Sequence, residues 1–192
     1  MKKILILSCV LLSFNACKQA TQNKNTEEAV TQEMAAEPTA FSKEALAQKV
    51  YDVDGNESTV EAVIAQHKGN KVVLDIWASW CRDCIAAMPE TAKLQAANPE
   101  LKFVFLSVDV KEENWKNGIE QYINANNVKG DQYFFNTGWK RPKKDEGVEN
   151  DFIKFAKLDW IPRYMVLDES GNIICYYAKS TKDDNFVKAL EK

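Results

Sequence analysis

Apolar residues fall into two patterns from residue 72 onward in this 192-residue chain. Near-continuous apolar runs, typical of strands covered on both faces, occupy four segments: 72–78, 101–108, 163–167 and 172–177. Helical spacing occupies four others: 84–97, 112–126, 148–157 and 183–191. Alternation of strands and helices, followed by a final hairpin and helix, predicts an α/β fold with a mixed central sheet and helices on both faces.

Local signals add detail before the first long strand. Residues 45–53 alternate loosely and precede Asp54-Gly55, which predicts a hairpin of two short strands. Ser58 and Glu61 have the spacing of a capping box, so a short helix is expected through Gln66. Residues 127–147 are the least periodic stretch of the domain, and we assign no element there.

The N-terminal segment has the pattern of a targeting sequence. Two lysines follow Met1, and residues 4–14 form an apolar stretch too short to span a membrane. Ala16 and Cys17 then resemble the cleavage site of a bacterial lipoprotein signal, in which the cysteine is lipidated. An ordinary cleaved secretory signal, with Cys17 incidental, is the alternative.

These features divide the chain into three parts. Residues 1–16 are the predicted signal peptide. Residues 17–42 are polar and poor in aromatics, so they cannot bury enough apolar area to offset chain entropy, and we expect a flexible tether. Residues 43–192 form the predicted domain.

Composition excludes several classes of function. The net charge is −3, which gives no basic footprint for nucleic acid. The chain has one histidine, His67, and five cysteines, so a histidine-rich metal site is excluded. We expect no metal and no cofactor.

The candidate chemistry lies where the first long strand meets its helix, at Cys81-Arg82-Asp83-Cys84. The free amides and dipole at a helix start stabilise a thiolate, so Cys81 is the expected nucleophile. Cys84, one turn later, can attack a mixed disulfide formed by Cys81 and is the expected resolving thiol. A purely structural disulfide is disfavoured because so short a loop gains little stability, and a zinc site lacks further ligands.

Several features together resemble the thioredoxin superfamily, and within it the TlpA-like group of the cell envelope. The stretch from Asp75 to Cys84 is similar to the strand and active-site entry of that family. Pro89 corresponds to a proline in its first long helix, and Ile161-Pro162 to its cis-proline. The resemblance implies a thioredoxin-like fold with an N-terminal β-hairpin extension.

The resemblance also implies roles for individual residues. Asp75 would relay protons to the buried thiol, with a pKa raised by desolvation. Trp80 would shield the sulfur and offer an apolar contact to a client. Ile161, followed by a cis Pro162, would bring backbone beside the sulfurs, where an extended client segment can pair.

The expected function is therefore that of an envelope thiol–disulfide oxidoreductase that reduces exported client proteins, apocytochromes among them. A membrane thiol-transfer protein would supply its electrons, and lipid on Cys17 would anchor it. The charged pair Arg82-Asp83 departs from relatives and leaves the redox direction open, so a disulfide oxidase or isomerase is an alternative. A copper-delivery protein that uses the two sulfurs is another, although His67 is poorly placed as a further ligand. A peroxidase lacks the expected threonine before either cysteine, and a non-enzymatic interaction lipoprotein would not explain the cysteine pair.

Overall fold

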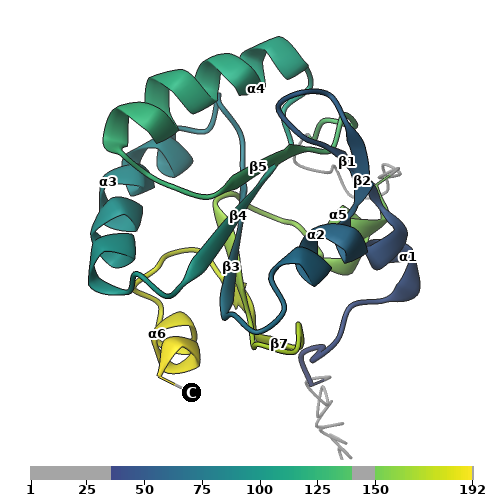
Figure 1. Ribbon diagram of the computed structural model, residues 1–192, viewed down its shortest axis with the longest axis vertical. Helices are drawn as coiled ribbons and strands as arrows, with labels where there is room; N and C mark the ends of the chain where they lie inside the picture. Colours follow the sequence, from purple (N-terminus) through teal and green to yellow (C-terminus); the bar gives the residue numbers. More distant parts are fainter. Residues whose placement is uncertain (1–35, 140–149, 192) are drawn as a thin grey trace, which may run out of the picture. The chain divides into compact units, whose positions relative to one another are not determined.

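A seven-stranded mixed sheet forms the centre of the fold (Figure 1). The computed structural model describes residues 36–139 and 150–191, and the predicted signal segment with Cys17 lies outside this range. The strands lie in the order β2-β1-β5-β4-β3-β6-β7. Their bounds are β1 Lys49–Tyr51, β2 Glu57–Thr59, β3 Val72–Trp77, β4 Lys102–Ser107, β5 Asp131–Phe134, β6 Arg163–Leu167 and β7 Ile173–Ala178. The mixed α/β sheet predicted from the apolar pattern is confirmed.

Strand β3 lies inside the sheet and has every residue buried. It pairs in parallel with β4 and antiparallel with β6. The continuous apolar run that predicted this strand thus reflects burial on both faces. The strand ends at Trp77, where the carbonyl of Trp77 accepts a hydrogen bond from the amide of Val108 at 2.9 Å.

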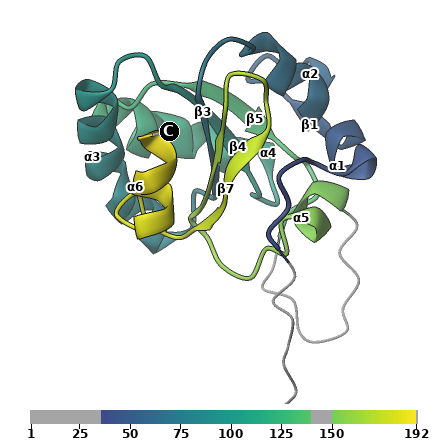
Figure 2. The ribbon, with the colours of Figure 1, turned by 90° about the horizontal axis from the view of Figure 1, so that it is seen from below.

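Helices cover both faces of the sheet, with α3 and α6 on one side and α1, α2 and α5 on the other (Figure 2). The crossovers from β3 to β4 and from β4 to β5 step in the same direction, so their helices share one face. The bounds are α1 Lys43–Ala47, α2 Val60–Gln66, α3 Arg82–Ala97, α4 Glu112–Gly118, α5 Asp151–Phe155 and α6 Asp184–Leu190. A π-helical turn, Ile119–Ile123, and a 3-10 turn, Asn124–Asn126, continue α4.

Aromatic side chains fill much of the space between the sheet and its helices. Trp115 of α4 stacks on Phe134 of β5, with ring centroids 5.3 Å apart. On the same side, Tyr164 of β6 meets Phe186 of α6 edge to face at 5.7 Å. Such pairs add to the stabilisation that burial already provides. They fix α4 and α6 against the sheet.

Three local predictions differ from the structure. Residues 45–47, predicted to begin a strand, belong to helix α1, because Ser42 caps this helix by accepting a hydrogen bond from the amide of Ala45. Thr59, not Ser58, caps α2 in the same way. Strand β5 lies within the aperiodic stretch 127–147; its pairing with β4 and β1, which no local pattern reveals, makes it a strand.

The start of the compact unit also differs from the predicted boundary. It begins at Ala36, whereas the sequence extended the tether to residue 42. The carbonyl of Thr39 accepts a hydrogen bond from the amide of Ile173, and Phe41 stacks on Phe152 with ring centroids 5.9 Å apart. The backbone of Thr39 and the ring of Phe41 thus attach residues 39–41 to β7 and α5.

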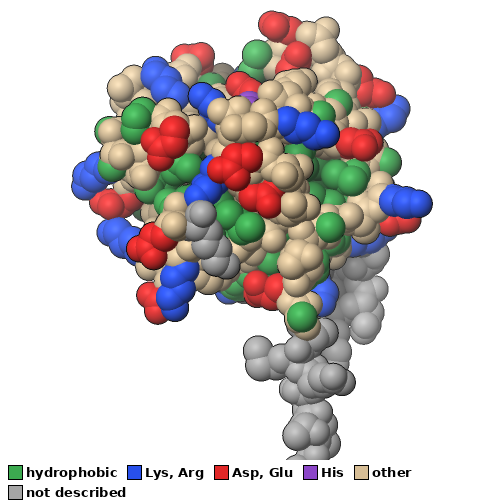
Figure 3. All heavy atoms as spheres, turned by 60° about the horizontal axis from the view of Figure 1, so that its bottom comes forward, with side chains coloured by type: hydrophobic (Ala, Val, Ile, Leu, Met, Phe, Trp, Pro, Cys, Tyr) green, Lys and Arg blue, Asp and Glu red, His purple; other side chains and the backbone are tan. Residues whose placement is uncertain are grey.

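The surface of the domain has a mixed charge. On the face shown in Figure 3, lysine and arginine side chains are interspersed with aspartate and glutamate. In the ranges 36–139 and 150–191, no helix combines the length and the apolar character that crossing a membrane requires.

Candidate active site

Cys81 is itself the N-cap of helix α3. Its sulfur accepts a hydrogen bond from the amide of Cys84 at 3.1 Å, so the helix begins at Arg82, two residues before the predicted start. The sulfur thus occupies the position where a side-chain acceptor satisfies a free helix amide. The same amide and the positive end of the helix dipole would stabilise a thiolate on Cys81 after reduction.

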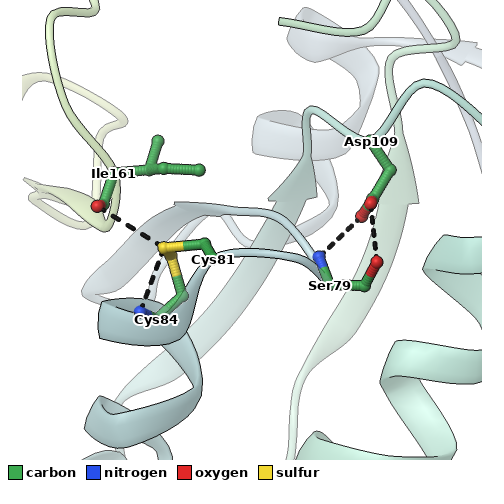
Figure 4. The surroundings of a disulfide bond; sticks show 5 residues. All are labelled: Ser79, Cys81, Cys84, Asp109 and Ile161. Carbon is green, nitrogen blue, oxygen red and sulfur yellow. Dashed lines mark hydrogen bonds between the residues drawn. A yellow bond between two sulfur atoms is a disulfide. The ribbon is translucent and has the colours of Figure 1, made fainter. Parts of the chain in front are cut away.

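The two cysteines form a disulfide next to a cis-proline loop (Figure 4). Their Cα atoms are 5.3 Å apart. The Ile161–Pro162 peptide bond is cis, as the resemblance implies, and the carbonyl oxygen of Ile161 lies 3.5 Å from the Cys81 sulfur. Cys84 is almost fully buried, and Cys81 retains a small exposed area. The structure therefore brings Cys81 and Cys84 together with Ile161 and Pro162, all of which the sequence singled out. Cys81 and Ile161 lie 80 positions apart in the chain.

A buried carboxylate that sequence reasoning missed holds the strand-to-helix loop in place (Figure 4). Asp109 follows β4 and accepts hydrogen bonds from the amide and the hydroxyl of Ser79, at 2.9 and 2.7 Å. It also accepts one from the hydroxyl of Ser107 at 2.9 Å. Ser79 lies two residues before Cys81, so Asp109 ties the nucleophile's loop to the end of β4. No motif in the sequence marks this contact, because it joins residues 30 positions apart.

An open groove of about 250 Å³ borders the disulfide. Its walls are three tryptophans, Trp80, Trp139 and Trp160, together with the first residues of α3 and Ile161. Trp80 is half exposed and stacks on the buried Trp139, with ring centroids 6.5 Å apart. Of the wall residues outside the Cys81–Cys84 motif, the sequence pointed to Trp80 and Ile161 only. Trp160 could have been found as the neighbour of Ile161-Pro162, whereas no local pattern distinguishes Trp139.

Asp75 lies beneath helix α3 rather than on the groove. It shares a face of β3 with Trp77, whose ring lies near Gly118 of α4, and α3 and α4 cover the same face. In the part of the chain that the structure describes, Asp75 Oδ1 has no hydrogen-bond partner. Burial raises the pKa of the Asp75 carboxyl from 3.8 to about 8, so the group is largely protonated at neutral pH.

The other candidate ligands lie away from this site. His67 ends α2, before β3 begins, and its Nε2 lies 3.0 Å from an Asp131 carboxylate oxygen. The cysteine pair follows β3, at the opposite end of the strand. Among the described residues, no group of three or more His, Cys, Asp or Glu side chains could hold a metal ion. Cys175 is buried in β7.

This arrangement can perform thiol–disulfide exchange. In the dithiol form, a Cys81 thiolate at the groove can attack a disulfide and release one thiolate of that disulfide. The Cys84 thiolate can then attack the mixed disulfide, so that the Cys81–Cys84 bond forms and the second thiolate leaves. Two electrons pass from the protein to its client.

Comparison with known proteins places this geometry in a family. The thioredoxin-like family model matches residues 69–173, from just before β3 to the first residue of β7. No significant match was found among curated proteins.

Solved structures of similar fold come from several bacteria. A candidate thiol–disulfide oxidoreductase of Bacteroides vulgatus is 25% identical, with a TM-score of 0.52 over 73% of this chain and 81% of that chain. A thiol–disulfide oxidoreductase from Bacteroides fragilis is 19% identical, with a TM-score of 0.55 over 74% and 93%. A secreted disulfide oxidoreductase of Mycobacterium tuberculosis, homologous to E. coli DsbE, is 16% identical, with a TM-score of 0.54 over 79% and 100%. Because the family model covers more than half of the sequence and the fold agrees, the chain belongs to the thioredoxin-like family.

Proposed function

We propose that this thiol–disulfide oxidoreductase works in the bacterial cell envelope, where it reduces disulfides of exported client proteins. One observation supports the reaction above all others. The Cys81 sulfur lies at the start of α3, beside an open tryptophan-lined groove and 3.5 Å from the carbonyl of Ile161. A client chain in that groove can pair with the backbone before Pro162 and present its disulfide to Cys81.

The envelope location is supported by the N-terminal pattern and by one similar protein. Residues 1–17 have the order of a lipoprotein signal, and the similar structure from Mycobacterium tuberculosis is described as secreted. Lipid on Cys17 would hold the domain at a membrane through residues 18–35. Labelling with a radioactive fatty acid tests this anchor: label is expected on the wild type and not on Cys17→Ala.

Within the proposed mechanism, the ionised fraction of Asp75 accepts the proton of the Cys84 thiol as that sulfur attacks. Its burial supports this role, because a carboxyl with a raised pKa can take up and release a proton near neutral pH. Release of client from the mixed disulfide should therefore be slower in Asp75→Asn. A release rate equal to that of the wild type at every pH would exclude the relay.

Redox direction and clients are tested by two measurements. A reductase should equilibrate with glutathione at a potential nearer to about −270 mV than to about −120 mV, the value of a strong oxidant. In cells, Cys84→Ser should accumulate mixed disulfides with exported proteins, apocytochromes among them, because the resolving thiol is absent. Cys81→Ser is the matched control and should trap none. Equal trapping by both variants would contradict the assignment of Cys81 as the nucleophile.

The electron donor follows from the same chemistry. Each turnover leaves Cys81 and Cys84 oxidised, so a dithiol must reduce them again. We propose that a membrane thiol-transfer protein does so: its thiolate attacks Cys81, the Cys81–Cys84 bond breaks, and its second thiol then releases the reduced protein. In cells that lack this donor, the Cys81–Cys84 pair should accumulate in its oxidised form.

A further inference from the structure

The loop that leads into β6 forms one wall of the active site. It runs from Ala156, just after α5, to Pro162, and it carries Trp160 and Ile161. Both side chains line the groove, and the Ile161 carbonyl faces the Cys81 sulfur (Figure 4). The position of this loop therefore decides how a client chain meets the nucleophile.

A buried arginine immediately after the loop contacts it at two points. Arg163, the first residue of β6, is fully buried. Its Nη1 donates to the carbonyl of Ala156 at 2.9 Å, and its Nη2 pairs with the carboxylate of Asp159. The planar Arg163 side chain thus links Ala156, at the start of the loop, and Asp159, near its middle, to strand β6.

The guanidinium is in turn held by strand β7. Its central carbon lies 3.7 Å from the centre of the Tyr177 ring, a cation–π contact. The Tyr177 hydroxyl and the Lys179 ammonium also approach Asp159, at 3.3 and 3.4 Å. Partial burial acts to raise the pKa of Asp159, but the charges of Arg163 and Lys179 outweigh it, and the pKa lies below its ordinary value.

Stability alone does not account for an arginine at this position. Burying a charge costs free energy, and a hydrophobic side chain of similar volume is often as stable as a buried ion pair. What a hydrophobic side chain cannot supply is the rigid fork of donors that reaches two acceptors at once. Both hydrogen-bond acceptors of the Arg163 fork, Ala156 and Asp159, belong to the loop, and none of the Arg163 contacts described above involves Cys81 or Cys84.

We propose that Arg163 is a positioning residue for client recognition, which fixes Trp160 and the Ile161 carbonyl in the geometry that a client chain requires. This inference rests on the proposed function. It implies that disturbing the clamp of Arg163 and Asp159 weakens binding of protein clients and leaves the cysteine couple unchanged.

The test compares Arg163→Lys and Asp159→Asn with the wild type in the reduction of insulin, a protein disulfide, with dithiothreitol as the reductant. We expect the KM for insulin to rise about three- to tenfold in Arg163→Lys, with kcat within about twofold, because the loss is one of substrate positioning. Asp159 is exposed, so Asp159→Asn should fold normally and show a smaller rise in the same direction. The rate with a small aromatic disulfide, dithiobis(nitrobenzoate), and the equilibrium with glutathione should not change.

A matched control separates positioning from general loss of stability. Val63→Ala removes buried volume from α2, a helix that contributes no residue to the groove or to the clamp, and should leave the KM for insulin unchanged. An unchanged KM in both clamp variants would overturn the inference. So would a parallel loss on insulin and on the small disulfide, a shifted glutathione equilibrium, or an equal KM rise in Val63→Ala. A wild type that reduces neither insulin nor the small disulfide would overturn the proposed function and this inference with it, whereas an active wild type with unchanged variants overturns the inference alone.

Discussion

Replacing Asp75 by asparagine should stabilise the oxidised protein, and by an amount that depends on pH. Asparagine has nearly the shape of a protonated aspartic acid but cannot ionise. Burial raises the pKa of Asp75 from 3.8 to about 8 in the folded chain, while the unfolded chain keeps the lower value. The folded state therefore holds a proton that the unfolded state releases at neutral pH.

The sign and size of this stability difference follow from the linkage between proton binding and folding. Below pH 4 the carboxyl is protonated in both states, so it causes no loss of stability. As pH rises from about 4 to about 8, only the unfolded state loses its proton, and the free energy of unfolding falls by about 1.4 kcal/mol per pH unit. The total loss is on the order of 5 kcal/mol, and it stays constant above about pH 8. Asp75→Asn escapes this loss.

Urea unfolding of the oxidised proteins between pH 4 and pH 9, followed by tryptophan fluorescence, measures the effect. The two stabilities should nearly coincide at pH 4, and the variant should be more stable by several kcal/mol at pH 8. Asp83→Asn removes an exposed carboxylate from the same region and controls for the loss of one negative charge. A difference in unfolding free energy between Asp75→Asn and the wild type that does not change with pH would refute the reasoning.

Three further predictions concern the support of the site. Asp109→Ala should lower the free energy of unfolding by about 2–4 kcal/mol in urea, because three donors from Ser79 and Ser107 lose a buried charged acceptor; a loss below about 0.5 kcal/mol would contradict this account. Gly118→Ala places a Cβ 2.6 Å from the Cβ of Ser79, so it should cost about 1–3 kcal/mol and slow insulin reduction, whereas wild-type behaviour in both assays would show that the loop yields freely. Trp80→Ala should raise the KM for insulin with a change in unfolding free energy within about 0.5 kcal/mol, because this side chain is half exposed; an unchanged KM would remove Trp80 from the client surface.

Predictions that depended only on residues close together in the sequence were accurate for much of the domain. The apolar runs located β3, β4, β6 and β7, and the cysteine spacing after β3 placed two sulfurs at a helix start. Each of these signals lies within one element or across one turn. The resemblance to thioredoxins then supplied the cis form of the Ile161–Pro162 bond, which composition could not.

Long-range contacts decided the rest. Strand β5 forms because β4 and β1 offer it partners, and Phe41 docks because α5 presents Phe152. Nothing local in residues 131–134 or 39–41 encodes those partners.

At the site, the sequence by itself determined the reacting atoms and their spacing. The tertiary structure decided what holds them in place. Asp109 accepts hydrogen bonds from Ser79, and Arg163 forms a hydrogen bond and an ion pair with the loop that carries Trp160. The physical reason is that the Asp109–Ser79 hydrogen bonds join the ends of β4 and β3, and the Arg163–Tyr177 contact joins β6 and β7, so both depend on strand order and register. Those are set by the packing of the whole chain, whereas the start of a helix is set by the few residues that form it.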